Sequence, residues 1–232
     1  AASVLLDEVE GKPLVYANNL DVASDGKIYF SEASSKFGAR ENGGTYPASL
    51  LDLMEHGGHG RLLVYDPVEK TAEVIADGFS FANGVALAHD ERSVLLAETG
   101  NYRVWRIWLE GEKRGQREIV LENLPGFPDN LSRGLNGKYW LGLVSPRNPL
   151  LDRLAPYPFW RKVVQRLPKF IRPSAKFYGH AVAFDDTGAI RASLQDPSGQ
   201  VHTVTGVLET PESLYIGSLL NHFIAVVKNQ PM

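Results

Sequence analysis

Hydrophobic and polar positions alternate along this chain in a pattern that recurs four times. The segments that share the pattern are 16–32, 81–98, 128–142 and 204–217. Each has a short strand of alternating hydrophobic and polar residues, a polar turn, and a second strand that is more continuously hydrophobic. Two of the turns carry Asp25-Gly26 and Asn136-Gly137, pairs typical of tight β-hairpins. The pattern therefore predicts a repeated hairpin and an all-β fold.

A second, more polar hairpin follows each of the first three segments. Its paired strands are predicted at 61–65 and 72–75, at 103–108 and 118–121, and at 181–184 and 190–193. Two successive hairpins form a four-stranded antiparallel sheet, which is the blade of a β-propeller. A β-sandwich of regular hairpins is the alternative fold, but the units align with one another closely enough to favour the propeller.

The chain length sets the number of blades. A blade takes about 40–45 residues, and a propeller has about 4–8 blades. Two insertions, 35–60 and 145–178, interrupt the β pattern, and the rest of the 232 residues suffices for about four blades. The last unit ends without an outer strand, which residues 1–11 are too weakly hydrophobic to supply. We therefore expect 1–232 to be a single propeller domain and the C-terminal part of a larger ring, whose N-terminal part is absent.

The two insertions differ in character. The first, 35–60, predicts a short helix with Pro47 near its start and Gly57-Gly58 as its stop. The second contains the segment 149–175, which is apolar and basic together and predicts an amphipathic excursion over one face of the propeller. Two interpretations stay open for it: a solvated lid with a buried apolar stripe, or a surface for a lipid or a hydrophobic substrate.

The composition excludes several classes of function. The chain is 44% hydrophobic, and no stretch reaches the ~18 apolar residues of a membrane span. A net charge of −3 argues against a general nucleic-acid binder. Zero cysteines exclude disulfides, thiolate zinc sites and thiol nucleophiles in this chain. A signal-peptide pattern, a serine nucleophile elbow, a phosphate-binding loop and a zinc-protease motif are likewise absent from the sequence, and the compartment stays open.

Polar residues recur at one register of the repeat. Alignment of the four units places Asn18, Asn83, Asp129 and Thr205 at the same register, just before the first strand, and Asn130 directly follows Asp129. The first strand of a blade lines the central channel, so these side chains are expected to converge on the axis. Amide and carboxylate oxygens are the ligands that Ca²⁺ prefers. The alternative is that they are turn residues that satisfy the backbone where strands begin.

Other polar residues give weaker signals. Glu32 and Glu98 share a register too, and we interpret them as strand ends rather than metal ligands. His56 and His59 lie in a glycine-rich segment that predicts an exposed loop and an incidental position. His180 precedes a strand near the second insertion, where a structural role is favoured over a pocket-facing one.

Several of these segments resemble the strictosidine synthase-like proteins. The resemblance rests on 78–85 (GFSFANGV), 124–131 (LPGFPDNL) and 214–218 (LYIGS), and it extends over nearly the whole chain. The family includes the adipocyte plasma membrane-associated proteins and, more distantly, the paraoxonases and the gluconolactonase/regucalcin group. It implies a six-bladed propeller of which this chain is roughly the last two-thirds, with a central calcium in the hydrolase branches.

The resemblance also implies roles for particular residues. The paraoxonase-type calcium ligands correspond to Asn18, Asn83, Asp129 and Asn130, which is the set found from the repeats. A further glutamate ligand and the histidine pair of paraoxonases have no counterpart in this chain. Strictosidine synthase itself uses a glutamate for its amine–aldehyde condensation, and Thr205 stands at that position here. This departure argues against the condensation.

The leading functional hypothesis is a calcium-dependent hydrolase of small hydrophobic esters or lactones. Ca²⁺ would polarise the substrate carbonyl, so that Asn130 and Asp129 act in catalysis through the metal, with a general base that the sequence does not identify. Two alternatives stay open: a non-catalytic scaffold stabilised by calcium, and a condensing enzyme despite Thr205. We expect the binding partner to be a small molecule rather than a nucleic acid. A lipid surface is a second expected contact, through 149–175.

Overall fold

The computed structural model describes residues 3–168, 170–171 and 175–229. The ends of the expected domain, 1–2 and 230–232, and residues 169 and 172–174 of the second insertion lie outside the described residues.

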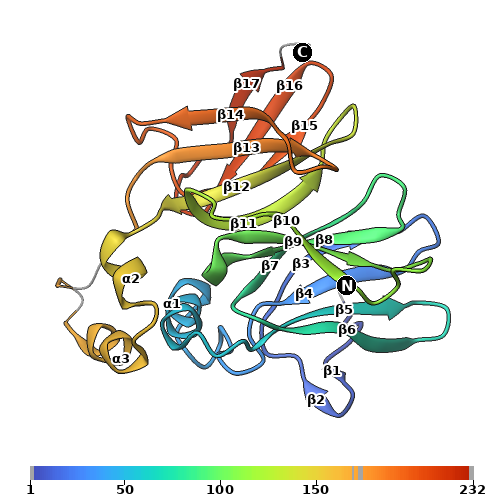
Figure 1. Cartoon of the computed structure of the whole chain (residues 1–232), viewed down its shortest axis with the longest axis horizontal. Helices are drawn as coiled ribbons and strands as arrows, with labels where there is room; N and C mark the ends of the chain where they lie inside the picture. Colours follow the sequence, from blue (N-terminus) through green and yellow to red (C-terminus); the bar gives the residue numbers. More distant parts are fainter. Residues whose placement is uncertain (1–2, 169, 172–174, 230–232) are drawn as a thin grey trace.

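Four antiparallel sheets follow one another along the chain (Figure 1). The first two sheets contain β3 (Ala17–Val22), β4 (Ile28–Glu32), β5 (Gly60–Asp66) and β6 (Thr71–Phe79), then β7 (Ala82–Leu87), β8 (Ser93–Glu98), β9 (Arg103–Trp108) and β10 (Arg117–Leu121). The last two contain β11 (Gly126–Arg133), β12 (Lys138–Pro146), β13 (Gly179–Asp185) and β14 (Ile190–Asp196), then β15 (Val204–Glu209), β16 (Ser213–Ser218) and β17 (Ala225–Lys228).

The sheets are the blades of a β-propeller. Within each, the strands pair in sequence order, and the first strands contact one another in succession, β3 with β7, β7 with β11 and β11 with β15. The four first strands therefore surround a common axis, and the predicted propeller of about four blades is confirmed. The predicted second hairpins are β5–β6, β9–β10 and β13–β14. As expected, the last blade has no fourth strand in the described part of the chain, and the short strands β1 (Glu8–Val9) and β2 (Lys12–Pro13) pair only with each other.

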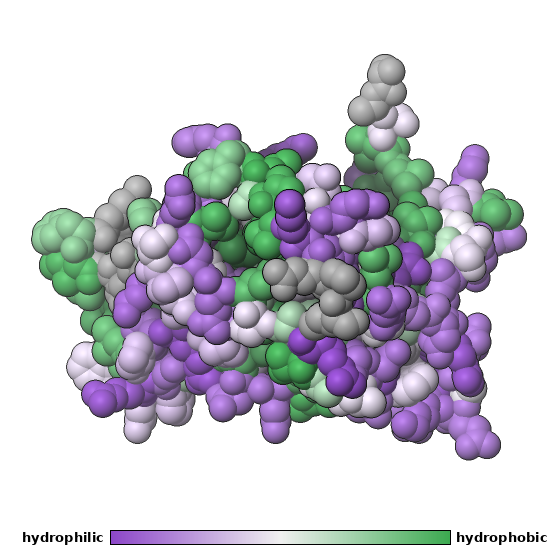
Figure 2. All heavy atoms as spheres, turned by 90° about the horizontal axis from the view of Figure 1, so that it is seen from above, coloured by the Kyte–Doolittle hydropathy of each residue, from purple (hydrophilic) through white to green (hydrophobic). Residues whose placement is uncertain are grey.

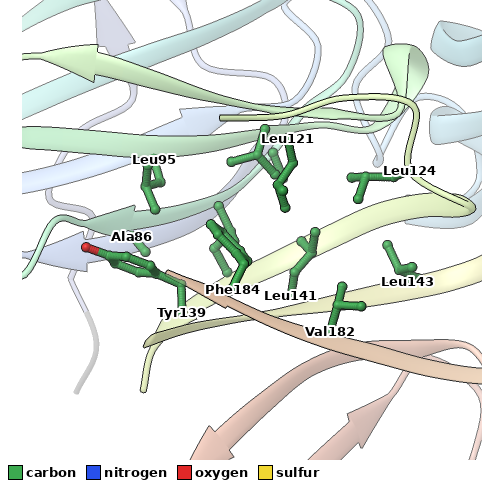
Figure 3. Packing of buried hydrophobic residues seen from close by; sticks show 12 residues of the cluster. Ala86, Leu95, Leu121, Leu124, Tyr139, Leu141, Leu143, Val182 and Phe184 are labelled. Atoms are coloured by element: carbon green, nitrogen blue, oxygen red, sulfur yellow. The ribbon is translucent and has the colours of Figure 1, made fainter. Parts of the chain in front are cut away.

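Hydrophobic layers between adjacent blades hold the propeller together. One layer joins the second and third blades: Leu95 and Leu121 face Tyr139, Leu141 and Phe184 across it (Figure 3). Similar layers join the first blade to the second and the third blade to the last. Burial of one large apolar side chain contributes roughly 1.5–3 kcal/mol. Strands β7 and β8 are buried along their whole length, whereas the outer strand β14 has no buried residue.

Two buried glutamates fix the segments that precede the first strands. Glu32 accepts a hydrogen bond from the backbone N–H of Val15 at 2.9 Å and pairs with Arg61 at 2.6 Å. Glu98 accepts from the N–H of Ser80 at 2.8 Å and pairs with Arg103. Burial by itself would raise the pKa of Glu98, but these hydrogen bonds outweigh it and lower that pKa. The sequence interpretation of both glutamates as structural residues at strand ends is confirmed.

Three helices lie together beside one end of the blades (Figure 1). As predicted for the first insertion, α1 (Thr45–Glu55) has Pro47 in its first turn, and it ends at His56 in a left-handed conformation before Gly57. The second insertion forms α2 (Pro149–Leu154) and α3 (Pro158–Arg166), each with proline at the first helical position. Helix α3 packs against α1 and α2. In the described ranges, no helix is long and apolar enough to cross a membrane.

Candidate functional site

A cavity of about 320 Å³ lies between the inner strands and the helices. One side, which we call the floor, consists of the repeat residues Asn18, Asn83, Asp129 and Asn130. The other side, which we call the helical wall, is formed by side chains of α1, α2 and α3: Leu50, Leu53, Met54, Leu151 and Arg161. Thr205 also lines the cavity, from β15. The structure thus brings all five predicted register positions to one place.

The floor residues of different blades are linked by hydrogen bonds. The side-chain amide of Asn18 donates to Oδ1 of Asn83 at 2.8 Å, and the Asn83 amide donates to Thr99 at 3.1 Å. Thr99 in turn donates to the backbone carbonyl of Pro128 at 2.7 Å, beside Asp129. The first strands of three blades are therefore held in a fixed relation at this point.

Asp129 is a carboxylate without a cationic partner. Burial raises its pKa to about 7, and the hydrogen bond with Asn83 opposes that rise. Within the described ranges, no lysine, arginine or histidine pairs with it. The Asn130 side chain likewise makes no hydrogen bond in the part of the chain that the structure describes. Its counterpart in the first blade, Asn19, differs, because Oδ1 of Asn19 accepts a hydrogen bond from the N–H of Val85 at 2.7 Å.

This donor set fits a calcium ion. Amide and carboxylate oxygens are hard ligands, and a divalent cation would compensate the unpaired charge of Asp129. The described residues contain no cluster of three histidine, aspartate or glutamate side chains, so amides would have to supply most of the ligands. The role of the four residues as metal ligands stays a prediction.

A glycine next to the floor allows the blades to approach closely. A Cβ atom on Gly84 would lie 2.3 Å from the backbone nitrogen of Leu131 and 2.4 Å from the carbonyl oxygen of Asp129. Backbone atoms cannot yield at such distances, so only glycine fits after Asn83. The close approach explains why this motif position holds glycine.

Three aromatic side chains line the cavity at a second repeated position. Tyr16, Phe81 and Phe127 each stand two residues before a floor residue, and all three face the cavity. The rings of Tyr16 and Phe81 meet edge-on at 5.5 Å. Burial raises the pKa of Tyr16 to about 12, with a further contribution from the charge of Asp129. The sequence analysis missed this set, although the spacing of aromatic, any residue, then Asn or Asp recurs in three units.

His56 also lines the cavity, which corrects the sequence interpretation of an exposed loop. Its Nδ1 lies 3.0 Å from the Ser80 hydroxyl and its Nε2 lies 3.1 Å from Oδ1 of Asn101. Burial lowers the pKa of His56, and the positive charge of Arg161 adds to that effect. The loop interpretation failed because the α1 helix turns its C-terminal residue inward. His180 bonds to Ser193 at 3.1 Å, in line with the expected structural role.

Two arginines of the second insertion line the cavity, one with an ion-pair partner and one without any partner among the described residues. Arg147 pairs with Asp152 at 3.0 Å and covers the Tyr102 ring at 4.2 Å. Arg161 on α3 is only 8% exposed, yet its guanidinium has no hydrogen bond or ion pair to any described residue, and its Nε is fully buried. Composition showed only that the segment is basic, so the sequence did not distinguish Arg161.

Comparisons with known proteins agree with this architecture. A family model described as strictosidine synthase matches residues 18–112. The adipocyte plasma membrane-associated protein of Rattus norvegicus is 38% identical over 226 residues, which are 93% of this chain and 58% of that protein. STRICTOSIDINE SYNTHASE-LIKE 13 of Arabidopsis thaliana is 33% identical over 231 residues, 97% of this chain and 53% of the relative. The chain thus spans somewhat more than half the length of these relatives.

Solved structures show the same fold at low sequence identity. A gluconolactonase from Xanthomonas campestris superposes with a TM-score of 0.63 at 19% identity, covering 94% of this chain and 59% of that one. A calcium-binding regucalcin from Agrobacterium tumefaciens gives a TM-score of 0.55 at 12% identity, covering 89% and 55%. From its sequence relatives, this chain belongs to the strictosidine synthase-like family, which includes the adipocyte plasma membrane-associated proteins.

Proposed function

We propose that this chain carries the calcium site of an ester or lactone hydrolase. The observation that supports the proposal best is Asp129, a partly buried carboxylate without a cationic partner among the described residues, which lines the cavity together with the amides of Asn18, Asn83 and Asn130. The fold shared with a gluconolactonase and with a calcium-binding regucalcin agrees with it.

Different residues of the chain would bind the metal and the substrate. Asn18, Asn83, Asp129 and Asn130 would hold Ca²⁺. When bound, Ca²⁺ supplies Lewis-acid stabilisation of the oxyanion that develops from the substrate carbonyl. The Asn83–Thr99 hydrogen bond keeps the floor rigid, so that its oxygens need little reorganisation. Tyr16, Phe81 and Phe127 provide an apolar surface that binds a small hydrophobic substrate and excludes water from it.

The test combines metal binding and turnover. Asn130→Ala should abolish calcium-dependent hydrolysis of phenyl acetate or a lactone and weaken calcium binding in a calorimetric titration. Asn130→Asp, which keeps an oxygen ligand at the same place, is the matched control and should retain binding. Full turnover after exhaustive chelation of the metal would contradict the proposal.

A non-catalytic scaffold is the second candidate. It is favoured by the hydrogen bonds that join three blades at the floor, since a metal there would also stabilise the assembly of blades. In that case calcium raises the melting temperature, but a panel of lactones and aryl esters shows no calcium-dependent turnover. The condensing activity of strictosidine synthase requires an acid where this chain has Thr205, so formation of a product from tryptamine and an aldehyde would reverse our ranking.

We further propose that the segment 149–175 contacts an anionic lipid surface. Hydrophobic surface lies at the end of the molecule that carries α2 and α3 (Figure 2). Phe159, Trp160 and Phe170 are 68%, 54% and 87% exposed, and Lys162 and Arg166 beside them are exposed cations. Apolar and basic side chains together are typical of a segment that lies in a membrane interface.

Co-sedimentation with vesicles tests this contact. Binding should require phosphatidylserine in phosphatidylcholine vesicles and should decrease when Phe159 and Trp160 are both changed to serine. Val68→Ser removes another exposed apolar side chain, in a turn of the first blade, and should leave binding unchanged. Equal sedimentation of all three proteins would contradict the proposal.

A further inference from the structure

Arg161 is a buried cation that no described residue neutralises. Its side chain is 8% exposed and lines the cavity from α3, with the Nε hydrogen pointing at no acceptor. Burial lowers the pKa of Arg161, but a guanidinium stays protonated in proteins at any ordinary pH. A buried charge without a partner is unfavourable, and such a side chain is tolerated in a site where a ligand supplies the partner.

No acid among the described residues forms an ion pair with Arg161, and Asp52, the buried acid of α1, does not line the cavity. His56, whose pKa the Arg161 charge lowers, directs its ring nitrogens at Ser80 and Asn101. Asp152 on α2 is engaged by Arg147 at 3.0 Å. Asp129 on the floor lies on β11 whereas Arg161 lies on α3, and no ion pair joins the two among the described residues. The floor therefore requires a cation and the helical wall requires an anion.

Most of the remaining cavity surface is apolar, although polar side chains such as Ser49 and Lys176 also line it. Leu50, Leu53 and Met54 of α1 and the ring of Phe127 line the same cavity as the two charged side chains. A ligand that satisfies all of these surfaces has a hydrophobic body and one anionic end. A planar guanidinium matches a carboxylate best, because two parallel N–H groups can donate to its two oxygens.

We propose that Arg161 binds the carboxylate of an amphiphilic substrate, whose ester or lactone carbonyl reaches the floor at the other end. The hydrolytic part of this statement rests on the proposed function, whereas the binding of a carboxylate by Arg161 does not. Helix α3 then sets the charge of the substrate that the cavity accepts.

Binding is measured first, on the full chain with calcium chelated, so that no metal can capture the ligand. The probes are 4-phenylbutyrate and its neutral amide, 4-phenylbutanamide, which have nearly the same shape. The wild type should bind the acid more tightly. Arg161→Gln should weaken binding of the acid roughly 10- to 100-fold, as expected for loss of charge-assisted hydrogen bonds, and binding of the amide less than about 3-fold.

Two variants on the same helix serve as controls. Lys162→Gln removes an exposed neighbouring charge and should change neither affinity. Arg161→Lys keeps the charge without the planar pair of donors and should recover part of the acid affinity. Thermal melting of each variant shows whether it is folded. Because the charge of Arg161 is uncompensated, Arg161→Gln should melt no lower than the wild type.

Three outcomes overturn the proposal: equal binding of acid and amide by the wild type, an equal loss of both in Arg161→Gln, or the same loss in Lys162→Gln. A phosphonate analogue that binds more than about 10-fold tighter than the carboxylate overturns the assignment of the anion. With metal restored, Arg161→Gln should raise KM for 4-acetoxybenzoate but not for phenyl acetate. Absence of turnover refutes the proposed function and leaves the binding result intact.

Discussion

The floor and the helical wall of the cavity each carry one charge without an ion-pair partner among the described residues, of opposite sign and in a different kind of scaffold. Asp129 lies on a strand that hydrogen bonds link to the second blade and, through it, to the first. Arg161 lies on a helix of nine residues inside an insertion between β12 and β13. In the proposed function, the repeat supplies a rigid position for a metal, and the insertion supplies the contact that selects the substrate. Such a division lets specificity change in the insertion while the repeat is kept.

The largest expected effect belongs to the charge of the floor. Asp129→Asn removes the only formally charged oxygen of the predicted calcium site and should lower calcium-dependent kcat/KM about 100- to 1000-fold, as for loss of a group that stabilises a developing oxyanion. In chelator the same variant should melt at a higher temperature than the wild type, because an uncompensated buried carboxylate is gone. Initial rates measure the change in kcat/KM, and melting curves measure the change in stability. Unchanged rates would contradict the role of Asp129 as the charged metal ligand of the floor.

Another acid, Asp52 on α1, is buried on the helical side of the molecule. Its ionisation is tested through the pH dependence of the unfolding free energy. Burial raises its pKa from 3.8 to about 6, and the opposing effect of Ser34 is smaller. The folded state therefore holds the proton more tightly than the unfolded state, so this group destabilises the fold as pH rises from about 4 to about 6. At about 1.4 kcal/mol per pKa unit, the loss above pH 6 is roughly 2–3 kcal/mol.

The variant Asp52→Asn should remove that loss. Its unfolding free energy should exceed that of the wild type by roughly 2–3 kcal/mol more at pH 8 than at pH 4. Denaturant titrations at the two pH values measure the difference between the proteins, so that other titrating groups cancel. An identical pH dependence in both proteins would show that Asp52 is already ionised without penalty.

The rigidity of the floor is tested at Gly84. Gly84→Ala places a Cβ against backbone atoms of Leu131 and Asp129, and the strands must separate to admit it. We expect a loss of about 1–3 kcal/mol in unfolding free energy and weaker calcium binding. Gly137→Ala is a control at an open hairpin turn with a positive φ of 74° and no neighbour within 4 Å, where backbone strain acts but no neighbouring strand is displaced. Calcium affinity should decrease only in the first variant.

The smallest effect is expected at the paired arginine of the wall. Arg147 and Asp152 are each about one-third exposed, and such ion pairs contribute about 0–1 kcal/mol. Arg147→Gln should therefore lower stability slightly and leave the affinity for 4-phenylbutyrate unchanged. A loss as large as that in Arg161→Gln would mean that the cavity recognises positive charge in general rather than one unpaired guanidinium.

The repeat pattern was sufficient to predict the blades and the convergence of four polar residues. Alternation in a strand determines which side chains face inward, and equal registers in successive blades bring residues as distant as Asn18 and Asp129 to one axis. The aromatic set Tyr16, Phe81 and Phe127 was within reach of the same reasoning, because it has the same spacing. His56 was not, because a glycine-rich sequence does not show that the preceding helix will turn its last residue inward.

By itself, the sequence determined the hairpins, the order of the blades and the chemistry of the floor, since these depend on local periodicity and on residue type at a repeated position. Only the tertiary structure decided which charges lack partners. Arg147 and Arg161 lie in one basic segment and look alike in sequence, but one meets Asp152 and the other is buried without an acid. Whether a charge is neutralised depends on contacts and burial produced by the packing of separate elements, and a one-dimensional pattern contains neither.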